Sequence, residues 1–251
     1  MEPLASVVVP FYNEQDTIEP LYAQIAAVFD SLADYRLECV FVDDGSTDDT
    51  AAKLAALAVR DPRVRPVYLA RNCGQSAALF TGMRHSLGEY ILTLDGDLQN
   101  DPADIPAFLA LLRFHDCVCG YRADRRDPWV RRISSWLANA VRNVVLRDGI
   151  RDSGCGAKGF RRHCVANLVP FNGLHRFFAV FIRAQGFSIV EHPVRHYARR
   201  AGVSKYGIHN RLWRGLFDLV GVAWLSRRQV ICIEKASPPA VAAPEERQRS
   251  A

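Results

Sequence analysis

The sequence predicts an α/β protein with a mainly parallel central sheet and helices on both faces. Short apolar segments alternate along the chain with longer segments whose apolar residues recur at helical spacing. The strand-like segments are apolar throughout, which is typical of parallel strands covered on both faces. Polar residues directly follow several of these strands, at the sheet edge where α/β proteins bind ligands.

Each element has its own local signal. The first predicted strand is a β-branched run that ends at a proline, and the later ones are apolar runs. Five strands are expected, at residues 5–10, 38–42, 64–70, 90–94 and 117–120. Four helices are expected between and after them, at residues 16–32, 50–59, 74–86 and 102–113. In the first helix one face carries the apolar residues Ile18, Leu21, Tyr22, Ile25, Val28, Phe29 and Leu32.

The composition fits a globular protein with one core, and its charge is unevenly distributed. Of 251 residues, 49% are hydrophobic and 24% are charged, as in ordinary soluble domains. Residues 1–120 carry 8 Lys and Arg against 18 Asp and Glu, a net charge of −10, whereas residues 121–251 carry 24 against 9, a net charge of +15. The acidic half suits a divalent cation and the basic half suits phosphates or an anionic membrane, although two solvated surfaces would give the same counts.

Several classes of protein are disfavoured. The seven cysteines include no C-x-x-C pair, so we expect neither a zinc site nor a disulfide framework, and Cys117 and Cys119 are interpreted as core residues. His175, His192 and His196 match no common zinc spacing. The N-terminus does not resemble a signal peptide, and no run reaches the ~18 apolar residues of a membrane span. The chain is expected to be soluble or peripheral.

The triplet Asp95-Gly96-Asp97 carries the strongest chemical signal. Two carboxylates at positions i and i+2 after a strand converge on one cation if the chain turns at Gly96. Such hard oxygen ligands suit Mg²⁺ or Mn²⁺ bridging two phosphates, although a solvated turn is the alternative for a single motif of this kind. Likewise, Asp43-Asp44 could simply cap the following helix, and Asp48 and Asp49 are assigned to that capping role.

Taken together, the motifs resemble a known family. The segments VPFYNE (9–14), VDDGSTDDT (42–50) and LDGDLQNDP (94–102) resemble the GT-A domain of glycosyltransferase family 2. Downstream, RRDPWVRRISS (125–135), RDSGCGAKGFRR (151–162) and RRAGVSKYG (199–207) look like its polyprenyl-phosphate branch, which includes dolichol-phosphate mannose synthase and bacterial undecaprenyl-phosphate relatives. The resemblance covers about residues 5–228 and implies a GT-A nucleotide-sugar-binding fold.

The resemblance also implies roles for individual residues. Five of them would border the nucleotide base and ribose of the donor: Pro10, Tyr12, Glu14, Val42 and Asp44. Asp95 and Asp97 would hold Mg²⁺ or Mn²⁺ on the diphosphate, with Gly96 lining the sugar-nucleotide and Gln99 beside the metal. Arg131, Arg199 and Lys205 would contact the donor and acceptor phosphates, and Arg200 could replace Arg199 in that role. Asp97, Arg131, Arg199 and Lys205 are therefore the expected catalytic residues.

The implied reaction is transfer of a sugar, with inversion, from a UDP- or GDP-linked donor to a polyprenyl phosphate. A lipid phosphate is already ionised at neutral pH, so it needs cations to hold it rather than a strong base. Asp152 would orient the acceptor or the sugar, or cap a helix. A family 2 enzyme with a glycan acceptor is the alternative, but its usual Q-x-x-R-W motif is absent. A silent nucleotide-binding protein is disfavoured by the intact motifs, and no nucleic-acid motif accompanies the basic half.

The C-terminal part suggests contact with a membrane. Residues 211–225 place Leu212, Leu216, Leu219, Val220 and Ala223 on one helical face and Arg211, Arg214 and Asp218 on another. An interfacial helix has this pattern, and so does a helix packed on the core. We therefore expect a catalytic domain at 1–210, an amphipathic membrane-interface extension at 211–235 and a disordered tail at 236–251. The protein would lie peripherally on the cytoplasmic face of the cell membrane, on an anionic surface, either alone or with a membrane-protein partner.

Overall fold

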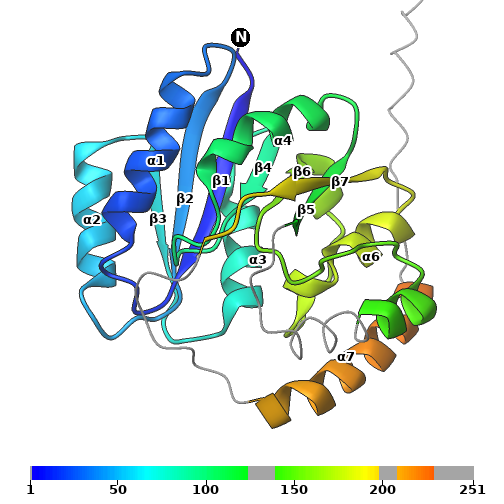
Figure 1. Ribbon diagram of the computed structural model, residues 1–251. Coiled ribbons are helices and arrows are strands. Elements are labelled where there is room, and N and C mark those ends of the chain that lie inside the picture. Colours follow the sequence, from blue (N-terminus) through cyan, green and yellow to red (C-terminus); the bar gives the residue numbers. More distant parts are fainter. Residues whose placement is uncertain (1, 124–138, 198–207, 229–251) are drawn as a thin grey trace, which may run out of the picture.

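The fold is a seven-stranded sheet with helices on both faces (Figure 1). The computed structural model describes residues 2–123, 139–197 and 208–228, and in the last range it describes side chains from residue 217 on. The strands are β1 (Leu4–Phe11), β2 (Arg36–Asp43), β3 (Val64–Tyr68), β4 (Tyr90–Thr93), β5 (Cys117–Arg122), β6 (Lys158–Arg161) and β7 (Ile189–Val194). The helices are α1 (Ile18–Asp30), α2 (Thr50–Arg60), α3 (Gln75–His85), α4 (Ile105–Leu112), α6 (Phe178–Ala184) and α7 (Ile208–Arg228).

The sheet is mainly parallel, as the sequence predicts. Its strand order is β3-β2-β1-β4-β6-β5-β7, and only β6 runs antiparallel to its neighbours. All five predicted strands and four predicted helices are confirmed. The sequence did not reveal β6 and β7, because β6 is a four-residue strand with a basic residue at each end and β7 is mostly half-buried, so neither forms an apolar run.

Two apolar clusters cover the two faces of the sheet. Successive residues of β1 point to opposite sides, so Val7 and Val9 join one cluster and Val8 joins the other. Side chains of α1, α2 and α4 complete the first cluster, and those of α3, α6 and α7 complete the second. Cys117 and Cys119 are fully buried in the second cluster, which confirms their core role.

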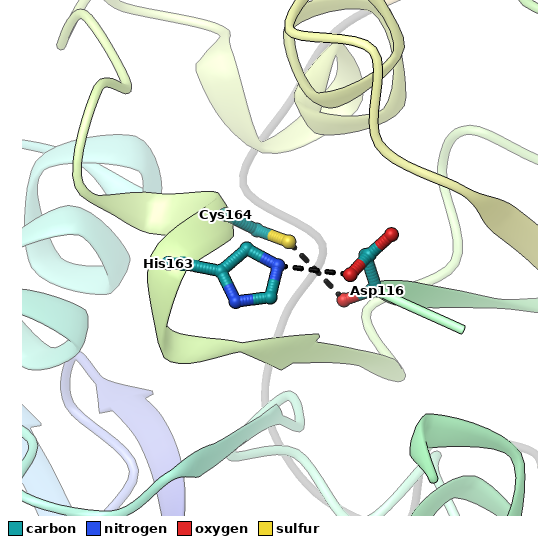
Figure 2. Close-up of side chains that lie close together, drawn as sticks. All are labelled: Asp116, His163 and Cys164. Carbon is teal, nitrogen blue, oxygen red and sulfur yellow. Dashed lines mark hydrogen bonds and ion pairs between the residues drawn. The ribbon is translucent and has the colours of Figure 1, made fainter. Parts of the chain in front are cut away.

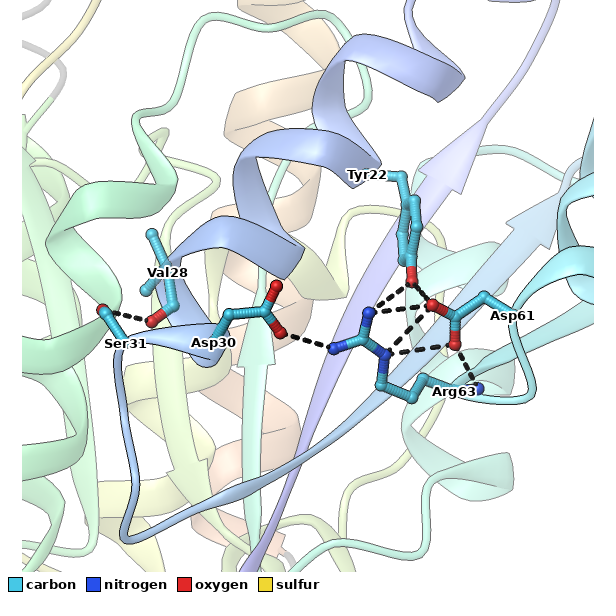
Figure 3. A network of polar contacts seen from close by, with 6 residues as sticks. All are labelled: Tyr22, Val28, Asp30, Ser31, Asp61 and Arg63. Carbon is cyan, nitrogen blue, oxygen red and sulfur yellow. Dashed lines mark hydrogen bonds and ion pairs between the residues drawn. The ribbon is translucent and has the colours of Figure 1, made fainter.

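A polar network joins α1 to the turn between α2 and β3 (Figure 3). The Arg63 guanidinium lies 2.8 Å from the Asp61 carboxylate and 2.9 Å from that of Asp30, and the Tyr22 hydroxyl donates to Asp61. The same guanidinium holds the pKa of Asp61 well below its usual range, whereas burial raises the pKa of Tyr22 to about 12. The network lies where β3 begins, far from the polar residues that follow the strands.

The structure corrects the predicted apolar face of the C-terminal helix. Leu219 and Val222 are buried, Val222 in the second cluster, whereas Phe217, Val220 and Trp224 are exposed. Leu219 and Val220, predicted to share one face, therefore lie on different sides, because α7 packs on the core through the Leu219–Val222 side. Asp218, which was assigned to the polar face, lies near Gly173.

Side chains of this helix are described from residue 217 on. Four other predicted interface residues therefore lie outside the described part, namely Arg211, Leu212, Arg214 and Leu216, and so does the expected tail at 236–251. Among the described helices, none carries an apolar stretch long enough to cross a membrane.

We predict that Gly82→Ala destabilises the protein although alanine favours helices. A Cβ at Gly82 in α3 would lie 2.4 Å from Val8 Cγ1 and 2.9 Å from Val42 Cγ2, and these buried β-branched side chains have little freedom to move. The expected loss is about 1–3 kcal/mol in the free energy of unfolding, measured in urea. The control is Gly221→Ala in α7, where nothing lies within 4 Å of the new Cβ; it should gain up to about 1 kcal/mol. Equal stability of both variants would show that α3 does not pack this tightly on the sheet.

Candidate active site

Three polar loops meet at one edge of the sheet. They follow the neighbouring parallel strands β1, β2 and β4 and comprise residues 10–14, 43–47 and 95–100. Because parallel strands end at the same edge, the fold brings together segments that are up to 90 residues apart in the sequence. Nine of the twelve predicted donor and metal residues belong to the described chain, and all nine lie at or beside this edge.

The loops after β1 and β2 are tied to each other. The backbone N–H of Asn13 donates to Ser46 Oγ at 2.9 Å, and the N–H of Thr47 donates to Asn13 Oδ1 at 2.8 Å. Asn13 has φ 53°, a left-handed conformation that asparagine tolerates. Tyr12 and Glu14, two of the predicted base and ribose contacts, flank it and are half-buried. Asn13 belongs to the polar residues that follow the predicted strands but was not among the predicted site residues, although its residue type and loop position are typical of such a turn.

The Asp44 carboxylate organises the start of α3. It accepts backbone N–H groups from Cys73 at 2.7 Å and Gly74 at 2.9 Å, and the Asn72 side chain at 3.1 Å. Burial raises the pKa of Asp44, and the two backbone donors oppose that rise. The predicted contact of Asp44 with the nucleotide stays a prediction. Its two oxygens are already hydrogen-bonded to residues 72–74, directly before α3. Val42 and Pro10, also predicted at the nucleotide, lie at the ends of β2 and β1.

The predicted capping aspartates behave differently from one another. Asp48 Oδ1 accepts the N–H of Thr50 at 3.0 Å, so Asp48 does support the start of α2. Asp49 occupies the N-cap position, but its side chain makes no capping hydrogen bond, so its assignment was wrong. Asp43 accepts the N–H of Ser46 at 3.0 Å within its own loop rather than capping the helix.

Asp95 and Asp97 lie together after β4, and the chain turns at Gly96 and Asp97 as predicted. The left-handed residue is Leu98, with φ 61°. Gly96 is needed for close packing, because a Cβ there would lie 2.8 Å from both the Pro10 carbonyl oxygen and the Phe11 ring. Asp95 is half-buried, Asp97 is 9% exposed, and Asp97 Oδ1 accepts the N–H of Gln99 at 3.2 Å.

The electrostatics of this pair favour a bound cation. Burial and the neighbouring Asp97 raise the pKa of Asp95 to about 6, although Lys158 and Arg122 oppose the shift. Two carboxylates that repel each other at close range favour a divalent ion between them. Gly156 covers this position, and a Cβ there would lie 2.1 Å from Asp95 Oδ2, so any side chain would displace the carboxylate. The pair and its surroundings therefore fit Mg²⁺ or Mn²⁺.

Hydrogen bonds and an ion pair hold the loop that carries Gly156 in place. Thr93 Oγ1 donates to the Gly156 carbonyl at 2.8 Å, and the buried Lys158 ammonium donates to the Cys155 carbonyl. Asp152 forms a two-pronged ion pair with Arg122, at 2.7 and 2.9 Å. Asp152 therefore does not cap a helix. Arg122, which the sequence analysis missed, places a guanidinium at the end of β5, on the same edge as Asp95.

The loop after Asp97 contacts the segment that leads to the predicted phosphate-binding residues. The N–H of Tyr197 donates to the Gln99 carbonyl at 2.9 Å, and Gln99 Nε2 donates to the Tyr197 carbonyl at 3.3 Å. The second described range ends at Tyr197, two residues before Arg199. Arg131, Arg199, Arg200 and Lys205 lie outside the described residues. The Gln99 side chain donates to Tyr197 through Nε2, whereas a metal ion would take the amide oxygen Oε1, and the predicted place of Gln99 beside the metal stays a prediction.

A second group of metal-ligand types lies at the opposite edge (Figure 2). Asp116 precedes β5, and its Oδ1 is 2.9 Å from His163 Nε2, while the Cys164 thiol donates to the Asp116 carbonyl at 3.2 Å. Ser188 donates its N–H and its hydroxyl to the other carboxylate oxygen. Burial raises the pKa of Cys164 to about 12, so the thiol stays protonated at neutral pH. This cluster is a hydrogen-bonded link between segments and is remote from Asp95.

We predict that Asp95→Asn stabilises the metal-free protein. Because the pKa of Asp95 is raised in the folded state, its ionisation opposes folding at every pH above its ordinary pKa, and fully so above about 6. Asparagine keeps the side-chain shape and removes that charge, so urea unfolding in EDTA at pH 7.5 should show a gain on the order of 1 kcal/mol. The gain should shrink towards pH 4.5. Asp34→Asn on the exposed surface is the control, and an equal gain there would contradict the explanation.

Comparison with known proteins identifies the family. Residues 6–168 match the glycosyl transferase family 2 model. A dodecaprenyl-phosphate galacturonate synthase of Rhizobium johnstonii is 38% identical over 228 residues, which cover 88% of this chain and 67% of that protein. An undecaprenyl-phosphate 4-deoxy-4-formamido-L-arabinose transferase of Edwardsiella ictaluri is 36% identical over 86% of this chain and 66% of its own length. The chain thus spans about two thirds of these relatives.

Solved structures support the fold. Glucosyl-3-phosphoglycerate synthase from Mycobacterium tuberculosis in complex with Mg²⁺ and UDP has a TM-score of 0.65 at 19% identity, covering 90% of this chain and 79% of that one. A complex of the same enzyme with Mn²⁺, UDP and glucosyl-3-phosphoglycerate also has a TM-score of 0.65, at 20% identity, over 90% of this chain and 80% of that one. The GT-A fold expected from the motifs is confirmed. The chain belongs to glycosyl transferase family 2 and is a glycosyltransferase whose sequence relatives act, by name, on polyprenyl phosphates.

Proposed function

We propose that the protein transfers a sugar, with inversion, from a UDP- or GDP-linked donor to a polyprenyl phosphate, with the help of Mg²⁺ or Mn²⁺. The observation that carries this proposal is the Asp95/Asp97 pair, held in excess negative charge at the carboxyl edge of the sheet. The names of the relatives support undecaprenyl or another polyprenyl phosphate as the acceptor class. A glycan acceptor is the alternative, and no observation at the site favours it.

Each group at the sheet edge has a part in the proposed reaction. A metal ion on Asp95 and Asp97 would neutralise charge that develops on the leaving nucleoside diphosphate. The tied loops with Pro10, Tyr12 and Glu14 would hold the base and ribose. Gly156 packs directly against the Asp95 carboxylate, which would keep it in place for the metal ion.

The acceptor needs holding rather than activation. A lipid phosphate is ionised at neutral pH, so the transfer proceeds by direct attack of a phosphate oxygen on the anomeric carbon, and no proton must be removed first. Cationic side chains would align the two phosphate groups. We assign this work to Arg131, Arg199 and Lys205. For Arg199, the support is that Tyr197, two residues before it, is hydrogen-bonded to Gln99, which lies two residues after Asp97.

We also propose that the surface formed by α7 and the helical segment at residues 139–146 faces an anionic membrane. Three apolar side chains of α7 are exposed at helical spacing, namely Phe217 (75%), Val220 (64%) and Trp224 (63%). The helical segment exposes three valines at similar spacing: Val141, Val144 and Val145. The inner sides of both elements pack on the same apolar cluster, through Leu146 and Leu225. Arg227 and Arg228 are exposed at the end of α7, where lipid headgroups would lie.

This membrane surface defines the proposed domain organisation. Residues 1–210 would form the catalytic domain and residues 211–235 the interfacial extension. The enzyme would bind the cytoplasmic face peripherally, alone or with a membrane-protein partner. An interfacial helix with a short apolar stripe and terminal arginines needs both apolar burial and electrostatic attraction for firm binding.

We predict that Asp97→Ala lowers turnover by about 100-fold or more and leaves the fold intact. The variant loses one of two carboxylate ligands, so the leaving diphosphate loses its neutralising charge. The measurement is formation of the glycolipid from undecaprenyl phosphate with a panel of UDP- and GDP-sugars, read by product mass, together with a circular dichroism spectrum. Turnover within a few-fold of the parent, independent of added metal, would contradict the assignment.

We predict that Phe217→Glu combined with Trp224→Glu abolishes co-sedimentation with anionic liposomes. Both side chains are exposed, so the variant should stay folded. The parent protein should bind at low salt and be partly released at high salt, because each basic residue near the surface contributes about 1 kcal/mol that salt screens. Val59→Glu replaces an 89% exposed valine on α2 and serves as the control. If the double variant binds as well as the Val59 variant, α7 does not face the membrane.

A further inference from the structure

We propose that Gln75 is a positioning residue that orients the Asp95 carboxylate for the metal ion, and that the first turn of α3 is built to hold it there. The inference rests on the proposed function, because it concerns the same metal pair. It is carried by contacts among described residues on three separate segments: the β2 end, the start of α3 and the turn at residues 173–175.

The direct contact is a side-chain hydrogen bond. Gln75 is the first residue of α3, and its Nε2 donates to Asp95 Oδ1 at 2.8 Å. The carboxylate is thereby fixed by one oxygen, while the second oxygen lies under Gly156. Groups that hydrogen-bond a metal ligand from outside set its orientation and typically change metal affinity when removed.

The residue type suits this role. Asp95 already suffers repulsion from Asp97, so a lysine at position 75 would neutralise the pair and compete with a divalent cation. A glutamate there would add a third negative charge. A neutral amide donor holds the carboxylate in place and leaves its charge available for the metal.

The backbone on the N-terminal side of Gln75 is fixed by Asp44. Its two carboxylate oxygens accept the N–H groups of Cys73 and Gly74, the two residues before Gln75. Gly74 has φ 88°, a conformation that glycine adopts without strain. Asp44 is 4% exposed, so these charge-assisted hydrogen bonds are shielded from water.

The backbone on the other side of Gln75 is fixed through Ser76. The Ser76 hydroxyl accepts the N–H of Gly173 at 3.0 Å and is hydrogen-bonded to Nδ1 of the half-buried His175 at 2.7 Å. Loss of contact with water lowers the pKa of His175 to about 3, so the ring is neutral at neutral pH. The first turn of α3 is therefore held from both directions, and Gln75 projects from a rigid support.

The test measures metal binding without turnover. We would titrate the full-length protein with Mn²⁺ in the presence of UDP or GDP and follow the electron paramagnetic resonance signal of free Mn²⁺. Gln75→Met keeps the length of the side chain and removes the donor, and it should weaken Mn²⁺ binding about 10- to 100-fold. Gln24→Met, at an exposed position on α1, is the matched control and should not change the affinity. Ser76→Ala should weaken Mn²⁺ binding in the same direction by a smaller factor.

Kinetics separate positioning from other roles. If Gln75 acts through Asp95, the metal concentration that gives half-maximal rate should rise in Gln75→Met, and turnover at saturating metal should return to within a few-fold of the parent. Unchanged Mn²⁺ affinity in Gln75→Met, in an assay where Asp95→Ala binds no metal, would overturn the inference and leave the proposed function standing. A raised KM for the donor with unchanged metal affinity would also overturn it. Absence of Mn²⁺ binding by the parent with either nucleotide would overturn the proposed metal dependence itself.

Discussion

The repulsion between two aspartates is the constraint around which this edge of the sheet is organised. Asp95 and Asp97 are held close together in a partly buried loop, and the raised pKa of Asp95 reports the cost of that arrangement. A metal-free protein would relax this repulsion by moving the loop, unless the surroundings prevent it. The surroundings do so mainly by close packing, because Gly96 rests on Pro10 and Phe11 and Gly156 rests on Asp95 itself.

Other charged side chains of the same region hold neighbouring segments together. Asp44, Asp152 and Lys158 are almost completely buried, and each binds backbone groups or a partner charge instead of solvent. A buried charge without such partners would cost several kcal/mol, so each contact is strongly directional. The resulting frame holds Asp95 and Asp97 side by side at the edge of the sheet. Rigid support of this kind keeps catalytic groups in place without reorganisation during the reaction.

Stability and activity draw on different parts of the fold. Two apolar clusters on the faces of the sheet and the Arg63 network at the start of β3 stabilise the fold. Among the predicted donor-binding residues that the structure describes, Val42 alone takes part in them. The helices on the second face include α7, which is buried on one side through Leu219 and Val222 and exposed on the other through Phe217 and Trp224. One helix can thereby belong to the core and still offer a membrane surface, so the two interpretations of its sequence are compatible.

Local sequence patterns were sufficient to assign the strands and helices up to β5 and the order of the motifs. Buried parallel strands are continuously apolar and surface helices are periodic, so five strands and four helices could be assigned from local patterns. The aspartate pair was also recognisable, because its two members are adjacent in the chain and follow an apolar run. Family membership followed from the spacing of such motifs along the chain.

The contacts between residues distant in the sequence became visible in the folded structure alone. The pairs Gln75–Asp95, Arg122–Asp152 and Asp44–Gly74 join residues 20 to 30 positions apart, and nothing in their local sequence specifies the partner. The need for glycine at 96 and 156 depends on neighbours from other segments. The side of α7 that is buried also depends on what packs against it, since Leu219 and Val220 are equally apolar in the sequence and have opposite surroundings in the fold. Local patterns record how a segment divides into apolar and polar faces, whereas the contacts of each face depend on how the segments pack.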